Sequence, residues 1–111
     1  MNRVKNGTLL VYAPEKPPRK TKLIAVTTAA EKMARLLNLN IEIVKQPQRT
    51  SPIYVYYENG KDEPVPIYCD RGKLHDTKEV CGALRNMLFV LSFHPKNSAL
   101  RNWRHTLMTL S

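Results

Sequence analysis

The sequence predicts a single small domain of the α+β or α/β class, in which a sheet of about four strands packs against three helices. The chain has 111 residues, enough to bury one core without disulfides or metal. Short runs of β-branched and aromatic residues end at prolines or at an Asn-Gly pair, which is typical of strands and turns. Three other segments have helix-start signals followed by apolar residues at helical spacing. The expected order is strand, an optional second strand, helix, three strands and two helices.

The first strand is expected at residues 7–13, an apolar run that stops at Pro14. Two more prolines follow closely, and proline is excluded from helix interiors and from central strands. Residues 14–22 are therefore predicted to form an exposed basic loop. Residues 22–26 are too few for their periodicity to distinguish a short strand from the lead-in to a helix.

The first helix is predicted to start at Thr28. Thr28 and Glu31 have the spacing of a capping box, in which each side chain accepts a hydrogen bond from a free backbone amide. The helix should end at Asn38 or Asn40, since asparagine tolerates the left-handed conformation at a helix C-terminus. Residues 40–46 alternate apolar and polar side chains, which predicts a strand.

Two tyrosine-rich strands are expected at residues 53–57 and 65–69. Asn59 and Gly60 between them favour the positive φ angles of a hairpin turn. The two prolines at the start of the second strand place it at a sheet edge, or delay its pairing until after Pro66.

The capping pattern recurs at Asp76 and Glu79, which predicts the start of a second helix. Residues 80–93 are apolar nearly all round, which predicts a buried central helix that ends before Pro95. A last helix, capped by Asn97 or Ser98, should have one apolar and one basic face. The apolar face consists of Leu100, Trp103, Leu107 and Leu110.

The order strand, helix, strand, proline, hairpin and helix resembles the topology of the thioredoxin-like fold. The resemblance covers residues 8–93, with Pro52 in the place of the proline that precedes the hairpin strand in that family. The redox Cys-x-x-Cys motif of the family would fall near residues 13–18, which contain no cysteine. The resemblance therefore implies a shared topology without the redox chemistry.

The two cysteines and two of the three histidines form the candidate metal or thiol site. Structural zinc sites use paired ligands two to four residues apart, whereas Cys69, His75, Cys81 and His94 are spaced more widely. Cys69 and His75 precede a helix start that would activate a thiol, but two nearby aspartates oppose thiolate formation. We therefore expect no metal, no cofactor and no catalytic residue, and a Cys69/His75 thiol enzyme is the weaker alternative.

The apolar runs and the cysteines together predict the cellular compartment. No run of 18 apolar residues exists, and the apolar run near the N-terminus is short and has no signal-peptide cleavage site. Free thiols are the default in a reducing compartment. The sequence thus predicts a cytoplasmic protein with no membrane partner.

The tyrosines of the hairpin allow two interpretations. Strand alternation places Tyr54 and Tyr56 on the face opposite Ile53, Val55 and Tyr57. If no helix covers them, the rings form an aromatic platform for nucleic acid bases; if a helix covers them, they belong to the core. Three helices favour the core, and the acids of the hairpin oppose a phosphate backbone there. On the second strand Tyr68 is expected on the platform side, opposite Ile67 and Cys69.

The net charge is +9, from 18 Lys or Arg and nine Asp or Glu, and the bases gather toward both ends of the chain. This predicts contact with a polyanion or an acidic protein. We expect a small basic non-enzymatic module that contacts nucleic acid non-specifically through loop 16–22 and helix face 101–105. The alternative is a protein-interaction or homodimeric adaptor of thioredoxin-like topology. The residues expected to contact nucleic acid are Lys16, Arg19, Lys20, Lys22, Arg101, Arg104 and His105.

Overall fold

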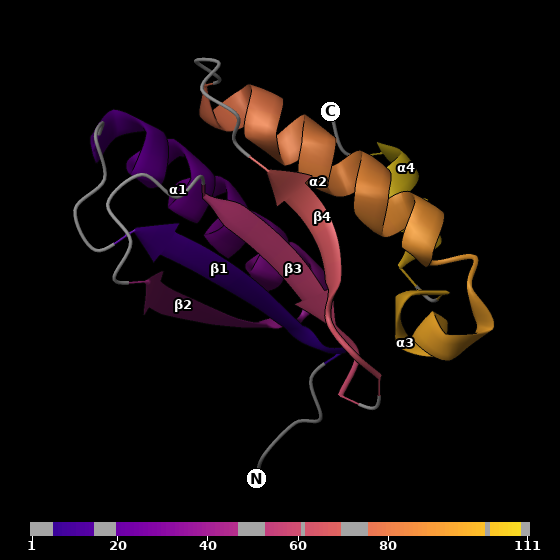
Figure 1. Cartoon of the computed structure of the whole chain (residues 1–111). Coiled ribbons are helices and arrows are strands. Elements are labelled where there is room, and N and C mark those ends of the chain that lie inside the picture. Colours follow the sequence, from indigo (N-terminus) through magenta and orange to yellow (C-terminus); the bar gives the residue numbers. More distant parts are fainter. Residues whose placement is uncertain are drawn as a thin grey trace, which may run out of the picture.

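The computed structural model of the chain describes residues 6–14, 20–46, 53–60, 62–69, 76–101 and 103–109. These residues form one four-stranded mixed sheet with helices packed on it, which confirms the predicted α+β class (Figure 1). In chain order the elements are β1 (Thr8–Pro14), α1 (Lys20–Leu37), β2 (Asn40–Gln46), β3 (Tyr54–Glu58), β4 (Val65–Cys69), α2 (Thr77–Leu91), the 3-10 turn η1 (Pro95–Asn97), α3 (Ser98–Arg101) and α4 (Arg104–Thr109).

The strands lie in the order β2-β1-β3-β4, with β1 parallel to β2 and β3 antiparallel to both of its neighbours. In Figure 1, α1 lies behind the sheet, and α2 packs against both α1 and β4. The strands contribute Leu9, Val11 and Val55 to the core from that side. No helix among the described residues covers the opposite face of the sheet. The resemblance to the thioredoxin-like topology stays a prediction.

Helix α1 starts earlier than the sequence pattern indicates. It begins at Lys20, so the prediction of a start at Thr28 is wrong, and residues 22–26 are helical. The Thr-x-x-Glu pattern lies inside the helix, where Thr27 Oγ1 donates to the carbonyl of Leu23 at 2.8 Å. The predicted end is confirmed, because Asn38 has a φ of 56° and the amide of the next residue donates to the carbonyl of Ala34 at 2.8 Å.

Strand β4 contains a β-bulge that changes which side chains face the core. Val55 pairs with Tyr68, but Tyr56 pairs with Pro66, so Ile67 is an additional residue in the ladder. Tyr68 consequently packs against the core instead of lying on the platform side, and that prediction is wrong. Cys69 pairs with Tyr54 and therefore shares the platform side, away from Ile67, whose side chain is buried as predicted.

Helix α2 begins as predicted but is less buried than predicted. Asp76 Oδ1 accepts from the amide of Glu79 at 2.8 Å, which confirms the capping box. One stripe, formed by every fourth residue, is buried, whereas Val90 is 61% exposed. The helix packs against other elements on one side only, so apolar residues on its other side stay in solvent. The buried stripe is Val80, Leu84 and Leu88.

The C-terminal segment forms two short helices instead of the one predicted. A turn at Trp103 separates α3 from α4. Leu100 and Leu107 are buried and Trp103 packs against the core, as the apolar face predicted, while Leu110 lies outside the described residues. Among the described residues, no helix is long and apolar enough to cross a membrane.

Candidate aromatic binding surface

Three tyrosines from two adjacent strands lie together on the uncovered side of the sheet. Tyr12 of β1 pairs with Tyr54 of β3, and Tyr56 is two residues further along β3. The ring centroids of Tyr12 and Tyr56 are 5.2 Å apart in an edge-to-face arrangement, and those of Tyr54 and Tyr56 are 6.3 Å apart. We call this set, Tyr12, Tyr54 and Tyr56, the tyrosine face.

The tyrosine face borders a hollow of about 600 Å³ that Glu63 and Pro64 also line. All three rings are half-buried, so part of each ring is open to a ligand. The prediction that these rings belong to the core is wrong for Tyr54 and Tyr56, because both long helices pack on the other side of the sheet. The surface can offer ring faces and edges for stacking, phenolic hydroxyls for hydrogen bonds, and one carboxylate.

A fourth hairpin tyrosine, Tyr57, shows the contrast between the two faces. Its ring is 1% exposed and its hydroxyl donates to the carbonyl of Asn6 at 2.8 Å. Burial raises the pKa of Tyr57 to about 12. Tyr57 therefore belongs to the core, as predicted.

The tyrosine face lies toward one end of the sheet. Strands β1, β2 and β4 finish at that end, where β3 begins. The chain leaves and re-enters the sheet there through the connections 15–19, 47–52 and 70–75, whose conformations lie outside the described residues. By sequence these connections contain two acids, Glu15 and Asp70, and five bases: Lys16, Arg19, Arg49, Arg71 and Lys73.

The structure separates the two basic segments that the sequence suggested as one interface. Lys16 and Arg19 lie outside the described residues, the side chain of Lys20 is not described, and Lys22 is half-buried. The start of α1 and the α3–α4 segment lie on opposite sides of the molecule in Figure 1. They therefore do not form one continuous surface.

On the α3–α4 segment, Arg101 and His105 are exposed, but Arg104 is engaged within the protein. Arg104 Nη2 donates to the carbonyl of Ser92 at 2.8 Å, and Nε donates to Ser92 Oγ at 3.2 Å. The guanidinium carbon lies 4.0 Å from the ring centroid of Phe93, in a cation–π contact. Arg104 thus joins the start of α4 to the end of α2, and binding a phosphate would compete with these contacts.

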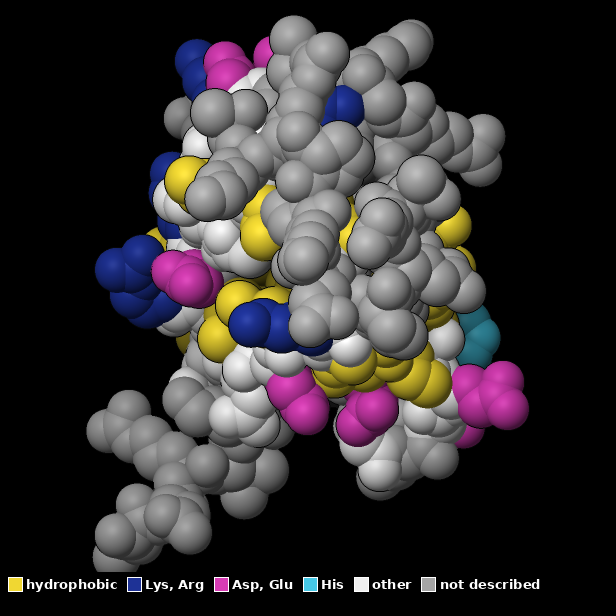
Figure 2. Space-filling view, turned by 60° about the vertical axis from the view of Figure 1, so that its left-hand side comes forward, with side chains coloured by type: hydrophobic (Ala, Val, Ile, Leu, Met, Phe, Trp, Pro, Cys, Tyr) yellow, Lys and Arg dark blue, Asp and Glu magenta, His cyan; other side chains and the backbone are white. Residues whose placement is uncertain are grey.

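The described side chains carry little of the net charge. They include nine Lys or Arg and seven Asp or Glu, against 18 and nine in the whole chain. In Figure 2, Lys and Arg side chains are interspersed with Asp, Glu and hydrophobic side chains across the described part of the visible face. By sequence, the remaining bases lie mainly in the connections and near the N-terminus.

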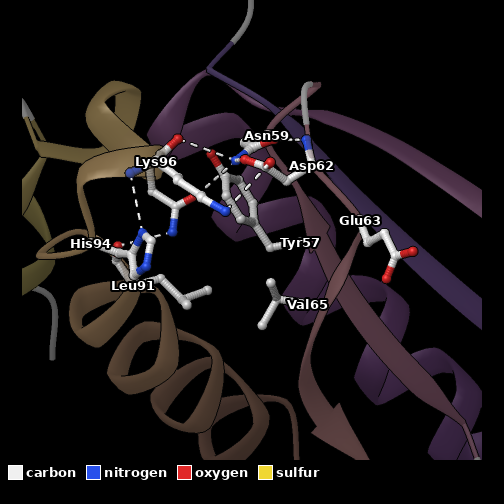
Figure 3. Close-up of a pocket in the computed structure, with 9 residues that line it drawn as sticks. Tyr57, Asn59, Asp62, Glu63, Val65, Leu91, His94 and Lys96 are labelled. Carbon is white, nitrogen blue, oxygen red and sulfur yellow. Dashed lines mark hydrogen bonds and ion pairs between the residues drawn. The ribbon is translucent and has the colours of Figure 1, made fainter.

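A second hollow, of about 410 Å³, lies between the β3–β4 turn and the residues that follow α2 (Figure 3). Its polar groups bond largely to one another. Asn59 Nδ2 lies within hydrogen-bond distance of the Lys96 carbonyl and of Asn97 Oδ1, and Lys96 Nζ lies 3.8 Å from Asp62. His94 Nδ1 accepts from the amide of Lys96 at 3.1 Å. These polar contacts hold the β3–β4 turn against the residues that follow α2.

Among the described residues, no group of three or more His, Cys, Asp or Glu side chains could hold a metal ion. Cys69 and Cys81 are half-buried free thiols. Burial raises the pKa of the Cys81 thiol above its usual value, although the charge of Lys32 acts in the opposite direction. His75 lies outside the described residues, so the structure does not test the Cys69/His75 pair.

Comparison of the chain with family models, with curated proteins and with solved structures found no match. Sequence reasoning missed Tyr12, whose place beside Tyr54 depends on pairing between strands 42 residues apart. The available signal was the alternation within residues 7–13, which puts Tyr12 on the face opposite the buried Leu9 and Val11.

Proposed function

We propose that this chain is a small non-enzymatic module that holds single-stranded nucleic acid on its tyrosine face. The observation that carries the proposal is the cluster of three partly open aromatic rings on a sheet face that no described helix covers. Every base has a π-face, so such rings bind bases with little sequence preference. The bases of a duplex are already stacked, so the proposal predicts a preference for single strands.

The connections that start beside the tyrosine face add the electrostatic part of the proposal. Lys16 and Arg19 of the predicted basic loop belong to one of them. Neutralising such cations with phosphates would make binding depend on salt. Glu63 beside the rings can accept hydrogen bonds from the amino groups of a base. Helix face 101–105 no longer forms part of the proposed contact, because Arg104 is engaged with Ser92 and Phe93.

Fluorescence anisotropy of labelled oligonucleotides tests the proposal. We expect the wild-type chain to bind a single strand more tightly than a duplex at physiological salt. Tyr54→Ala or Tyr12→Ala should weaken binding about 5- to 150-fold, the equivalent of roughly 1–3 kcal/mol of stacking per base. Tyr54→Phe keeps the ring and should stay within a few-fold of the wild type.

Arg101→Glu distinguishes the tyrosine face from the basic helix face. Arg101 is exposed at the end of α3, a helix that contacts α2 and η1, so this variant should bind nearly as tightly as the wild type. A large loss of affinity in Arg101→Glu together with normal binding by Tyr54→Ala would mean that nucleic acid binds at α3–α4 and not at the tyrosine face. No binding at physiological salt by the wild type would refute the proposal.

The second candidate is a protein-interaction adaptor of thioredoxin-like topology without redox chemistry. Exposed apolar side chains near the end of α2 and on α4 favour it, with Val90 at 61%, Phe93 at 55% and Met108 at 67% exposure. Such side chains are enriched at protein interfaces. Salt-insensitive capture of a partner that Val90→Ser abolishes, with no nucleic acid binding, would favour this candidate.

A further inference from the structure

The two edges of the sheet differ in how they are protected from pairing with another chain. Strand β4 carries Pro66 and the bulge at Ile67, and α2 packs against it. Proline and bulges at an edge prevent addition of a further strand. Strand β2 has seven residues and no proline, and its partner in the sheet is β1. The β2 edge is therefore the less protected one.

Hydrogen bonds within the sheet show which residues of β2 direct their backbone groups outward. The amide of Asn40 donates to the carbonyl of Gly7 at 2.9 Å, on the side of β1. Because the N–H and C=O of one residue point to the same side of a strand and alternate along it, Glu42 and Val44 also point to β1. No backbone hydrogen bond among the described residues uses the groups on the outer side. The residues on that side are Ile41, Ile43 and Lys45.

The side chains of β2 include an exposed isoleucine. Ile43 is 47% exposed, although it lies on the same side of the sheet as α1. Ile41, two residues earlier, packs against the core. An open backbone ladder beside an exposed β-branched side chain is the arrangement that accepts a further strand.

We propose that β2 pairs antiparallel with β2 of a second copy of this chain, centred on Ile43. The three outward residues then form hydrogen-bonded pairs, which satisfies their N–H and C=O groups. Each Ile43 side chain lies beside its symmetry mate and leaves solvent. Like charges do not face each other in this register, because Lys45 faces Ile41 and Glu42 faces Val44.

The dimer would have one continuous eight-stranded sheet. Its two-fold axis would run perpendicular to the sheet, which places both tyrosine faces on the same side. The proposal rests on the β2 edge and does not depend on what the tyrosine face binds.

Mass and amide exchange of the full chain test the proposal together. Light scattering after size exclusion should give twice 12.8 kDa at high protein concentration, falling toward 12.8 kDa on dilution. Hydrogen exchange by NMR should show protection of the Ile41, Ile43 and Lys45 amides that increases with protein concentration. The amide of Val44 points to β1 and should be protected at every concentration. A monomer at millimolar concentration, or a dimer with unprotected outward amides, would overturn the proposal.

Two variants at one position separate the edge from other surfaces. Ile43→Pro removes an outward N–H without removing a bond to β1, and Ile43→Lys puts two ammonium groups together at the two-fold axis. Both should lose the dimer while keeping the folded circular dichroism spectrum. Ile24→Lys makes the same change at an isoleucine of α1 that is 61% exposed, and should remain dimeric. A dimer that survives both Ile43 variants, or that only Ile24→Lys disrupts, would place the interface elsewhere and refute the β2 pairing.

Discussion

The buried phenol of Tyr57 should make the stability of this protein fall at high pH. Its ring is 1% exposed and its hydroxyl donates to the Asn6 carbonyl at 2.8 Å. Burial raises the pKa of Tyr57 from its usual value of 10.0 to about 12. Above pH 10 the unfolded chain therefore releases this proton while the folded chain retains it. The contribution of Tyr57 to the free energy of unfolding is fully present below pH 10 and is lost as the pH rises through about 12.

The size of the effect follows from the shift in pKa. One pKa unit corresponds to about 1.4 kcal/mol, so Tyr57 accounts for a loss of at most roughly 2.7 kcal/mol between pH 10 and pH 12. Tyr57→Phe removes the titrating group and its hydrogen bond. The variant should lose about 1 kcal/mol at neutral pH, and its stability should fall less steeply than that of the wild type above pH 10.

Urea unfolding followed by circular dichroism at pH 7, 10, 11 and 12 measures both effects. The comparison is the difference in unfolding free energy between variant and wild type at each pH, which cancels the contributions of all other groups. Tyr54→Phe, at a half-buried position of the tyrosine face, is the reference for removing a hydroxyl that is not buried in the core. Equal pH slopes in Tyr57→Phe and the wild type would refute the reasoning.

Other substitutions test the packing by thermal or urea unfolding. Gly7→Ala should destabilise the protein by about 1–3 kcal/mol, because φ is +137° and a Cβ would lie 2.7 Å from both Tyr57 Cε1 and the Glu58 carbonyl oxygen. The Cβ of Gly82→Ala in α2 would meet nothing within 4 Å, so this variant should be more stable by about 0.5–1 kcal/mol. Leu88→Ala should cost about 2–5 kcal/mol because Leu88 is fully buried, and a cost below about 1 would contradict the placement of α2. Arg104→Met should cost about 1–3 kcal/mol, whereas Arg101→Met at an exposed position should be nearly neutral.

Local signals in the sequence predicted the elements well where one short pattern suffices. Asp76 and Glu79 form the capping box that their spacing indicates, and Asn38 ends α1 in the left-handed conformation. The same type of pattern misled at Thr28, because a Thr-x-x-Glu spacing also occurs inside a helix that began earlier. A capping pattern alone does not show whether the preceding residues are already helical.

Features that depend on pairing between distant segments could not be predicted from such local patterns. The bulge in β4 turns Tyr68 toward the core, because Tyr56 pairs with Pro66 and shifts the ladder by one residue. Tyr12 joins the tyrosine face only because β1 lies between β2 and β3. Apolarity alone also suggested that α2 is buried all round, whereas the number of layers decides how much of it is covered.

The two-layer arrangement links the two proposals and gives them a joint test. Both long helices pack on one side of the sheet, so no described helix covers the tyrosine face. Strand β2 forms one edge of the same sheet and carries the exposed Ile43. Pairing of two β2 strands would present two tyrosine faces to one long strand, so the second contact would become intramolecular and raise affinity. Ile43→Pro should therefore bind a short oligonucleotide that reaches one tyrosine face as the wild type does, and lose the additional affinity for a long one. Equal loss for both lengths would mean that Ile43 contributes to a single tyrosine face. Unchanged binding of both, with the dimer lost, would mean that the two faces act independently.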